Sequence, residues 1–127
     1  MIKIIFALRR LPHLSRDEFQ IYWREKHGPL AQKKLPLLQV KRYVQTHTLD
    51  TPFNEVLQSS RGTLEPYDGV VELWWESIED LETAFETPEG AQASEELLND
   101  EREFIDLSRS SMWFAEEHVF IDDGKPR

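Results

Sequence analysis

The sequence predicts an α+β fold with the element order β-α-β-β-α-β, the ferredoxin-like arrangement. Three observations support this prediction. A chain of 127 residues has the size of one domain with its own core. Four segments alternate in hydropathy with the period of strands, and two capped regions carry apolar residues at helical spacing. The strands are apolar on both faces, whereas the helices can cover only one face of a sheet.

The first strand is predicted over Ile2–Arg9. A helix follows, because Ser15 and Glu18 have the spacing of a capping box. We expect this helix to end near Gly28-Pro29, since glycine suits a left-handed C-cap and proline cannot continue the hydrogen-bond ladder. His27 would then lie at a helix C-terminus, where the helix dipole favours the protonated imidazole.

The second strand is predicted over Val40–Leu49, and its period of two places Tyr43, Gln45 and His47 on one face. The segment from residue 51 to residue 67 is expected to be an excursion that contains a short helix and a loop. The third strand, Val70–Glu76, follows a turn signal.

The rest of the chain predicts helices, a strand and a tail. Ser77 and Thr87 are expected to cap two helical segments, the second of which fades near residues 99–100. The last strand is expected over Met112–Ile121, with Phe114 and His118 on the same face. Residues 1–121 would form a single domain, and residues 122–127 a frayed tail.

The apolar character of both sheet faces predicts self-association. Adjacent residues that point to opposite faces are both apolar in the pairs Ile4-Ile5, Trp74-Trp75 and Trp113-Phe114. An uncovered apolar face of this size would favour aggregation. We therefore expect a homodimer in which two sheets face each other and close an eight-stranded dimeric α+β barrel.

The composition excludes several classes of protein. The absence of cysteine excludes disulfides, thiolate metal sites and a cysteine nucleophile. A net charge of -9 argues against binding to nucleic acid or an anionic membrane. Mean hydropathy is -0.57, and no apolar run is long enough to span a bilayer. The N-terminus lacks a signal-peptide core, so a cytoplasmic protein is expected.

The charge is unevenly distributed along the chain. Residues 1–50 carry ten Lys or Arg against four acidic residues, whereas residues 72–117 carry fifteen acidic residues against two Arg. Two solvated helix faces of opposite sign would explain this, and so would complementary surfaces in a homo-oligomer.

No motif for a nucleotide, a phosphate group or a metal is present. The chain lacks GxGxxG, GxxxxGK[ST] and GxSxG. The histidines, which are His13, His27, His47 and His118, show neither i, i+4 nor H-x-H spacing. We therefore predict no metal and no cofactor, which leaves general acid–base chemistry or the binding of a small organic ligand.

The polar face of the second strand suggests a site. If Tyr43, Gln45 and His47 point inward, they project into a cavity whose expected aromatic walls are Trp74, Trp113 and Phe114. Further candidates are His27, Glu72 and His118. Imidazole titrates near neutral pH, and a phenol can donate to a developing enolate. Each candidate also has a structural explanation, since His27 can cap a helix, Tyr43 can be a core residue and His118 can be a solvated edge residue.

Several segments resemble the EthD family. They are Ile2–Phe6, Leu14–Phe19, Tyr22–Leu30, Arg42–His47, Tyr67–Gly69 and Glu72–Trp74. The W-x-x-x-H-G-P element from Trp23 to Pro29, in a capped helix, is the most specific of them.

The resemblance implies ferredoxin-like protomers that dimerise through their sheets. The name-giving members belong to a bacterial pathway that degrades a branched alkyl ether, alongside a haem monooxygenase system. Relatives include cofactor-independent muconolactone isomerases and fungal polyketide dehydratases, in which a histidine at the helix end and a tyrosine on the second strand are implicated in proton transfer. These correspond to His27 and Tyr43, with His47 a third expected catalytic residue. The muconolactone-type relatives also use a cysteine, which this chain lacks.

Three functions follow as hypotheses. The first is a cofactor-free lyase or isomerase, in which His27 or His47 is the general base and Tyr43 stabilises charge on a substrate oxygen. The residues expected to contact the substrate are Gln45, Glu72, Trp74, Phe114 and His118. The second is a non-catalytic ligand-binding or accessory protein of an oxidative degradation pathway, and the third is a haem-dependent oxidoreductase.

Overall fold

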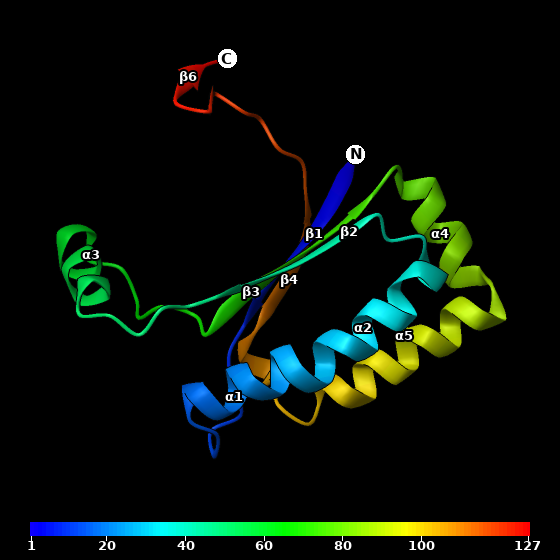
Figure 1. The fold of residues 1–127 in the computed structure, drawn as a ribbon, viewed down its shortest axis with the longest axis horizontal. Coiled ribbons are helices and arrows are strands. Elements are labelled where there is room, and N and C mark those ends of the chain that lie inside the picture. The colour runs from blue at the N-terminus through cyan, green and yellow to red at the C-terminus, as the bar shows by residue number, and fades with distance from the viewer.

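The computed structural model describes residues 1–127 and has a four-stranded antiparallel sheet with helices on one face (Figure 1). The strands are β1 (Ile2–Leu8), β2 (Arg42–His47), β3 (Gly69–Trp75) and β4 (Ser111–Ala115). Their order in the sheet is β2-β3-β1-β4, and every neighbouring pair is antiparallel. The predicted ferredoxin-like α+β fold is confirmed.

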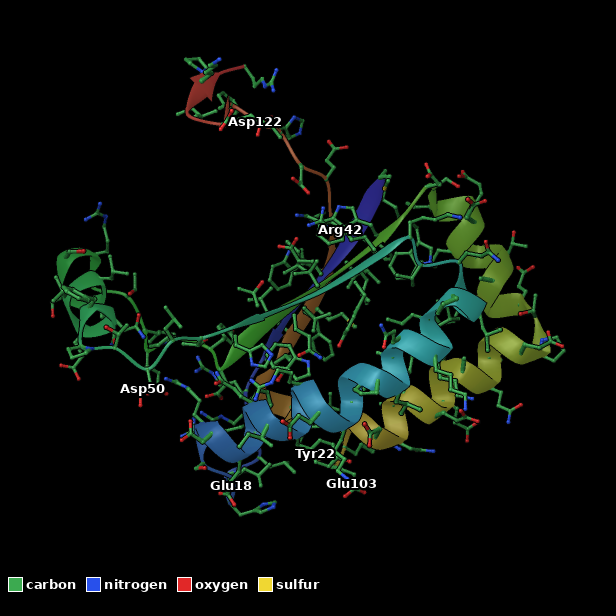
Figure 2. All side chains as sticks on the ribbon, viewed as in Figure 1. Glu18, Tyr22, Arg42, Asp50, Glu103 and Asp122 are labelled. Atoms are coloured by element: carbon green, nitrogen blue, oxygen red, sulfur yellow. The ribbon has the colours of Figure 1, made fainter.

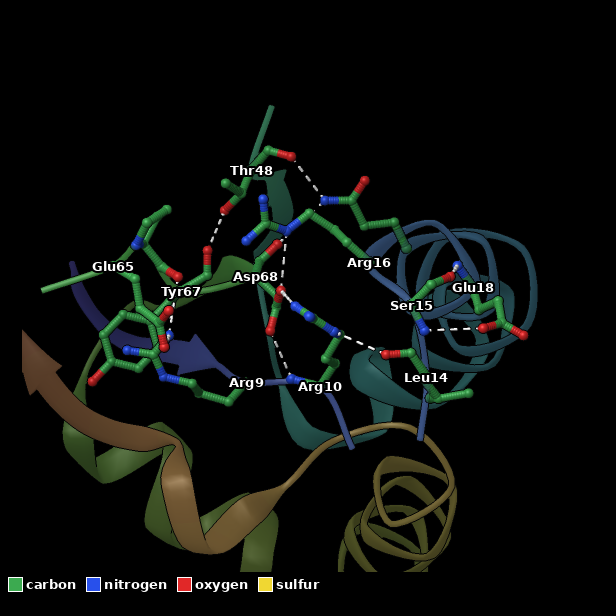
Figure 3. Close-up of polar contacts among 12 residues, drawn as sticks. Arg9, Arg10, Leu14, Ser15, Arg16, Glu18, Thr48, Glu65, Tyr67 and Asp68 are labelled. Atoms are coloured by element: carbon green, nitrogen blue, oxygen red, sulfur yellow. Dashed lines mark hydrogen bonds and ion pairs between the residues drawn. The ribbon is translucent and has the colours of Figure 1, made fainter. Parts of the chain in front are cut away.

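The first helical region runs from Arg16 to Leu38 without a break. It comprises α1 (Arg16–Tyr22), a π-helical turn η1 (Trp23–His27), α2 (Gly28–Lys34) and a 3₁₀ turn η2 (Leu35–Leu38). The predicted capping box is present: Ser15 Oγ accepts from the Glu18 N–H at 3.1 Å, and Glu18 Oε1 accepts from the Ser15 N–H at 2.9 Å (Figure 3).

The predicted helix end at Gly28-Pro29 is wrong. Gly28 is right-handed, with φ −54° and ψ −53°, and its N–H bonds to the Trp23 carbonyl five residues earlier. The wider π turn accommodates the proline, which lacks an N–H and would crowd the carbonyl four residues before it in a regular α-helix. The left-handed cap is instead Gln39, with φ 64°.

The second helical region packs beside the first. It consists of α4 (Ile78–Glu86) and α5 (Pro88–Glu101). The Ser77 and Thr87 side chains cap these helices as predicted. Helix α5 continues to Glu101, slightly beyond the predicted end. Outside these layers, α3 (Phe53–Arg61) projects from the sheet and buries no residue (Figure 1).

The predicted last strand is wrong beyond Ala115. Ala115 pairs with Lys3, and β1 begins one residue earlier, so almost no backbone remains for the chain to pair with. The chain leaves the sheet and forms a small hairpin of β5 (Ile121–Asp122) and β6 (Lys125–Pro126), away from the sheet (Figure 1). This hairpin occupies the predicted end of the strand, at Ile121, and the residues 122–127 that were predicted to form a frayed tail. The three-residue 3₁₀ turn η3 (Leu107–Arg109) precedes β4, and no helix follows the strand.

The core lies between the sheet and the helices. The first helical region contributes Phe19 and Trp23, both fully buried, which pack against Phe6, Leu8 and Val71 of the sheet. No helix covers the opposite face, where Arg42 lies in Figure 2, while Tyr22 lies on the helix side. No helix has the length and apolar character required to cross a membrane.

A buried carboxylate connects three loops at one end of the sheet. Asp68, which is 2% exposed, accepts hydrogen bonds from the Arg10 N–H at 2.8 Å and from Arg16 Nε at 3.0 Å (Figure 3). It also accepts from Arg10 Nη1. Asp68 therefore joins the chain that follows β1, the start of α1 and the start of β3.

Candidate functional site

A narrow cavity of about 50 Å³ lies between the sheet and the helices. Most of its lining side chains are apolar, and β1, β3, α2 and α5 all contribute some of them. Three of its lining residues can move protons: His27, Tyr43 and Glu101. Each comes from a different element, namely the π turn, β2 and the end of α5.

The orientation of His27 is set by an acidic partner. Its Nδ1 atom lies 2.7 Å from Asp100 Oδ2, and the other oxygen of Asp100 accepts a 2.6 Å hydrogen bond from the Tyr22 hydroxyl. Because a carboxylate only accepts, Nδ1 of His27 carries the hydrogen, and Nε2 is left with a lone pair. Burial, together with the Asp100 carboxylate, raises the pKa of Tyr22 to about 12.

The expected helix C-terminal position of His27, with a dipole-stabilised positive charge, is wrong. His27 lies within a continuous helical region, in the π turn, and is buried. Burial lowers its pKa below the ordinary value, against the opposing effect of Asp100. The imidazole is therefore neutral at neutral pH and can act as a base through Nε2.

Glu101 has the strongest perturbation at the site. Burial in the apolar wall, reinforced by the neighbouring Asp100 carboxylate, raises the pKa of Glu101 to about 7. At neutral pH both the acid and its carboxylate are therefore populated. A carboxyl group poised in this way can donate or accept a proton during a reaction.

Gln45 organises the polar face of β2. Its Nε2 donates to the Trp23 carbonyl at 3.0 Å and to the Tyr43 hydroxyl at 2.8 Å. A backbone carbonyl accepts only, so the amide orientation is determined. The Tyr43 hydroxyl oxygen therefore receives a hydrogen bond, and its own hydrogen stays free to donate. Burial raises the pKa of Tyr43, which keeps the phenol protonated.

His47 lies behind this arrangement. Its Nε2 is 2.7 Å from Gln45 Oε1, and its ring stacks on the Trp23 indole at 4.2 Å between centroids. Because Gln45 Oε1 accepts, Nε2 of His47 carries the hydrogen, and its buried Nδ1 has no hydrogen-bond partner. Burial and the nearby Arg24 lower the pKa of His47, in agreement with a neutral ring.

The structure separates the remaining predicted site residues from this cavity. Tyr43 pairs with Leu73, and the neighbouring Glu72 and Trp74 point to the opposite face of the sheet. There Glu72 accepts from Lys3 at 3.1 Å, and Lys3 also lies over the Trp74 ring. The expected pocket that combined Trp74 with Tyr43 is therefore wrong, because the two side chains lie on opposite sides of the sheet.

Phe114 and His118 also lie outside the cavity. Phe114 pairs with Ile4, so it shares the helix face, but β4 is an edge strand and Phe114 is 55% exposed. The His118 side chain lies beyond the end of β4 and is 73% exposed, and its Nε2 lies 3.3 Å from Glu116 Oε1. The predicted continuation of the strand, which placed His118 beside Phe114, does not occur.

Sequence reasoning missed Glu101, Asp100 and Tyr22. A signal for Glu101 was available, because it continues the buried stripe of α5 formed by Ala93 and Leu97 at intervals of four residues. An acidic residue on an apolar stripe is unusual unless it has a function or a partner. Asp100 and Tyr22 are 78 positions apart in the chain, and no local pattern connects them.

A larger groove adjoins the cavity. It has a volume of about 440 Å³ and runs between α2 and the edge strand β2. Ala31, Leu35 and Tyr43 line both spaces. No three His, Asp or Glu side chains lie close enough together to hold a metal ion. A haem group does not fit the residues present, since the cavity with His27 has a volume of only about 50 Å³ and no histidine lines the larger groove.

Solved structures with the same fold include two proteins of one family. An ethyl tert-butyl ether D (EthD) family protein from Bacillus halodurans C-125 is 20% identical, with 93% of this chain and 100% of that chain covered and a TM-score of 0.59. An EthD-like protein from Ralstonia eutropha JMP134 is 17% identical, with 96% of each chain covered and a TM-score of 0.64.

A third structure, a dimeric ferredoxin-like protein of unknown function from Thermobifida fusca YX, is 14% identical, with 91% of this chain and 90% of that chain covered and a TM-score of 0.56. No curated protein sequence is significantly similar to this chain. The model of the EthD domain matches residues 11–108, which include the capped helix, the π turn, β2, β3 and Glu101. The chain therefore belongs to the EthD family.

Proposed function

We propose that this protein catalyses proton transfer on a small organic molecule, as a cofactor-free lyase or isomerase. One observation carries the proposal. Three side chains with different proton-transfer properties line one apolar cavity, namely His27, Tyr43 and Glu101. An apolar environment strengthens the electrostatic interactions of these groups and shifts their pKa values toward useful ranges.

We assign the first proton transfer to Nε2 of His27. This atom would remove a proton from a carbon next to a substrate carbonyl, and the electron pair of the broken C–H bond would form an enolate. Asp100 supports this role because it holds the Nδ1–H tautomer and stabilises the imidazolium that results. Tyr22 keeps Asp100 in place through the second carboxylate oxygen.

Tyr43 would stabilise the enolate oxygen. Its hydroxyl hydrogen is free to donate, because its oxygen already accepts from Gln45. Gln45 also bonds to His47 and to the Trp23 carbonyl, so the position of the phenol depends on a connected set of contacts. His47 therefore acts as a positioning residue behind Tyr43.

Glu101 would complete the reaction. When the substrate has a β,γ double bond, the enolate is a dienolate, and protonated Glu101 can deliver its proton to the γ-carbon, which gives the conjugated isomer. Glu101 can equally protonate a departing hydroxyl group, which gives an alkene and water. The imidazolium of His27 then returns its proton to the Glu101 carboxylate, so that each cycle ends with both groups in their starting states.

Turnover of enolisable lactones and hydroxyanthrones tests the proposal. We expect His27→Ala, Tyr43→Phe and Glu101→Gln to lower the rate by about 10²–10⁴-fold each. His118→Ala, which changes an exposed histidine, is the matched control and should keep the wild-type rate. Equal rates in all five proteins would overturn the assignment and favour a non-catalytic ligand-binding protein.

We also propose that the protein is a homodimer. The helix-free face of the sheet exposes Trp113, which is 45% accessible, beside Ile5 and Ala7. The similar Thermobifida fusca protein is described as dimeric. Burying this face against a second copy would remove apolar surface from water. Sedimentation at micromolar concentration should give twice the mass of 15.0 kDa, whereas a single 15.0 kDa species would refute a dimer.

A further inference from the structure

We propose that the groove beside the cavity binds the carboxylate of an amphipathic substrate, with Arg24 and Lys41 as its cationic partners. This inference rests on the proposed function, because it assigns a chemical class to the molecule that reacts beside Tyr43. It begins with the charge of the groove. The lining includes Arg24, Lys41 and Arg42 but no Asp or Glu. An acidic protein of net charge -9 thus has a positively charged groove next to its candidate catalytic cavity.

Two of the three cations are available to a ligand in the groove. The guanidinium of Arg42 lies 4.9 Å from the centre of the Trp74 ring, on the helix-free face of the sheet. Lys41 makes no ion pair, and Arg24 has only a 4.0 Å contact with Glu25, in which both side chains are mostly exposed. Such an exposed contact contributes little, so the charges of Lys41 and Arg24 can be redirected to a bound anion.

The groove also has an apolar wall. Pro29, Leu35, Pro36 and Val40 line it alongside the two cations. A ligand that matches both features carries an apolar body and one negatively charged group. A completely polar anion would leave this wall without a partner, and a neutral hydrocarbon would leave the cations unused.

The cavity determines which end of the ligand reacts. Glu101 is partly ionised at neutral pH, and Asp100 lies behind His27, so an anionic group is repelled from the cavity. The carboxylate would therefore stay between Arg24 and Lys41. Because Tyr43 lines both spaces, the uncharged end of the same molecule would reach the Tyr43 hydroxyl. The two cations thus orient the substrate as well as attract it.

Binding of trans-cinnamate to the wild-type protein tests this inference. Chemical shifts in ¹H–¹⁵N spectra should change around Gly28, Tyr43 and Gln45, and the affinity should fall as salt is added. Cinnamamide, which has the same shape without the charge, should bind at least five-fold more weakly. Equal affinities would overturn the proposal, and so would shifts centred on Arg10 and Arg16, where a second group of arginines surrounds Asp68.

Charge-removing variants sharpen the test. The double variant Arg24→Gln/Lys41→Gln should weaken cinnamate binding at least ten-fold. The control Lys26→Gln/Lys33→Gln removes the same charge outside the groove and should change the affinity less than two-fold. An equal loss in the two double variants would show that only net charge matters, and tighter binding of phenyl phosphate than of cinnamate would refute a carboxylate site.

The two proposals fail in different ways. If His27→Ala and Tyr43→Phe abolish turnover of neutral compounds while cinnamate does not bind in the groove, the carboxylate site is wrong and the catalytic function stands. If cinnamate binds as expected but no enolisable carboxylate is turned over, the catalytic function is wrong and the groove is a binding site.

Discussion

A β-carbon on Gly69 would overlap the Trp23 indole, at 2.6 Å from its Cη2 atom, because the indole packs directly on the backbone of β3. The same indole stacks on the ring of His47, the residue of β2 that pairs with Gly69 of the neighbouring strand β3. The absence of a side chain at residue 69 therefore allows the π turn to approach the sheet closely enough for Gln45 to reach the Trp23 carbonyl.

Substitution of Gly69 by alanine should destabilise the fold. The added methyl group would overlap two indole atoms and the Thr46 carbonyl, so we expect a loss of about 1–3 kcal/mol in the free energy of unfolding. Urea denaturation measures this loss. Gly62→Asn is the control, because its left-handed backbone suits asparagine and no atom lies within 4 Å of a β-carbon there. Equal stability of Gly69→Ala and wild type would contradict this packing.

Asp100→Asn should separate the effect of burial on the pKa of His27 from the effect of the Asp100 carboxylate. Burial lowers the pKa of His27 and Asp100 raises it, so removal of the carboxylate leaves burial unopposed. We expect the imidazole titration, followed by NMR, to move to lower pH, with turnover about 10²–10⁴-fold slower. Glu103→Gln, an exposed acid two residues beyond Glu101, should leave the titration unchanged. A shift to higher pH would refute the role of Asp100.

Glu101→Gln should stabilise the folded protein at alkaline pH. The folded-state pKa of about 7 exceeds the ordinary value of 4.5, so the folded state retains its proton as pH rises and loses stability between these two values. Glutamine avoids this loss, and the variant should be more stable than wild type by up to roughly 3 kcal/mol at pH 8. The difference should vanish at pH 4. His27 and His47 titrate in both proteins, so their contributions to the pH dependence of stability cancel in the comparison. If the difference in free energy of unfolding between variant and wild type were constant from pH 4 to pH 8, the pKa of Glu101 would not be raised in the folded state.

Asp68→Asn should weaken the junction between β1, α1 and β3. Hydrogen bonds from Arg10 and Arg16 hold the pKa of Asp68 below its ordinary value, against the opposing effect of burial. The carboxylate therefore stabilises the fold above pH 3.8, and this stability is lost as the pH falls through its lowered pKa. At pH 7 we expect Asp68→Asn to cost about 1–3 kcal/mol, measured by thermal unfolding, because the hydrogen bonds to its buried carboxylate are weakened. Asp17→Asn, on an exposed helix position, should cost less than about 0.5 kcal/mol.

Much of the architecture could be predicted from the amino-acid sequence by itself. The order of the elements, the caps at Ser15, Ser77 and Thr87, and the shared face of Tyr43, Gln45 and His47 all follow from short-range patterns. These features depend on residues within a few positions of one another, where the period of a helix or strand and the chemistry of a cap determine the outcome.

Only the tertiary structure decided which faces meet. Alternation shows that Tyr43 and His47 share a side of β2, but the pairing of Tyr43 with Leu73 decides that Glu72 and Trp74 lie on the other side of the sheet. The rotation of α5 about its axis brings Glu101 to the cavity, and packing against Gly69 positions Trp23 at the start of the π turn. Such relationships depend on register and on the packing of distant segments, which the periodicity of one segment does not contain.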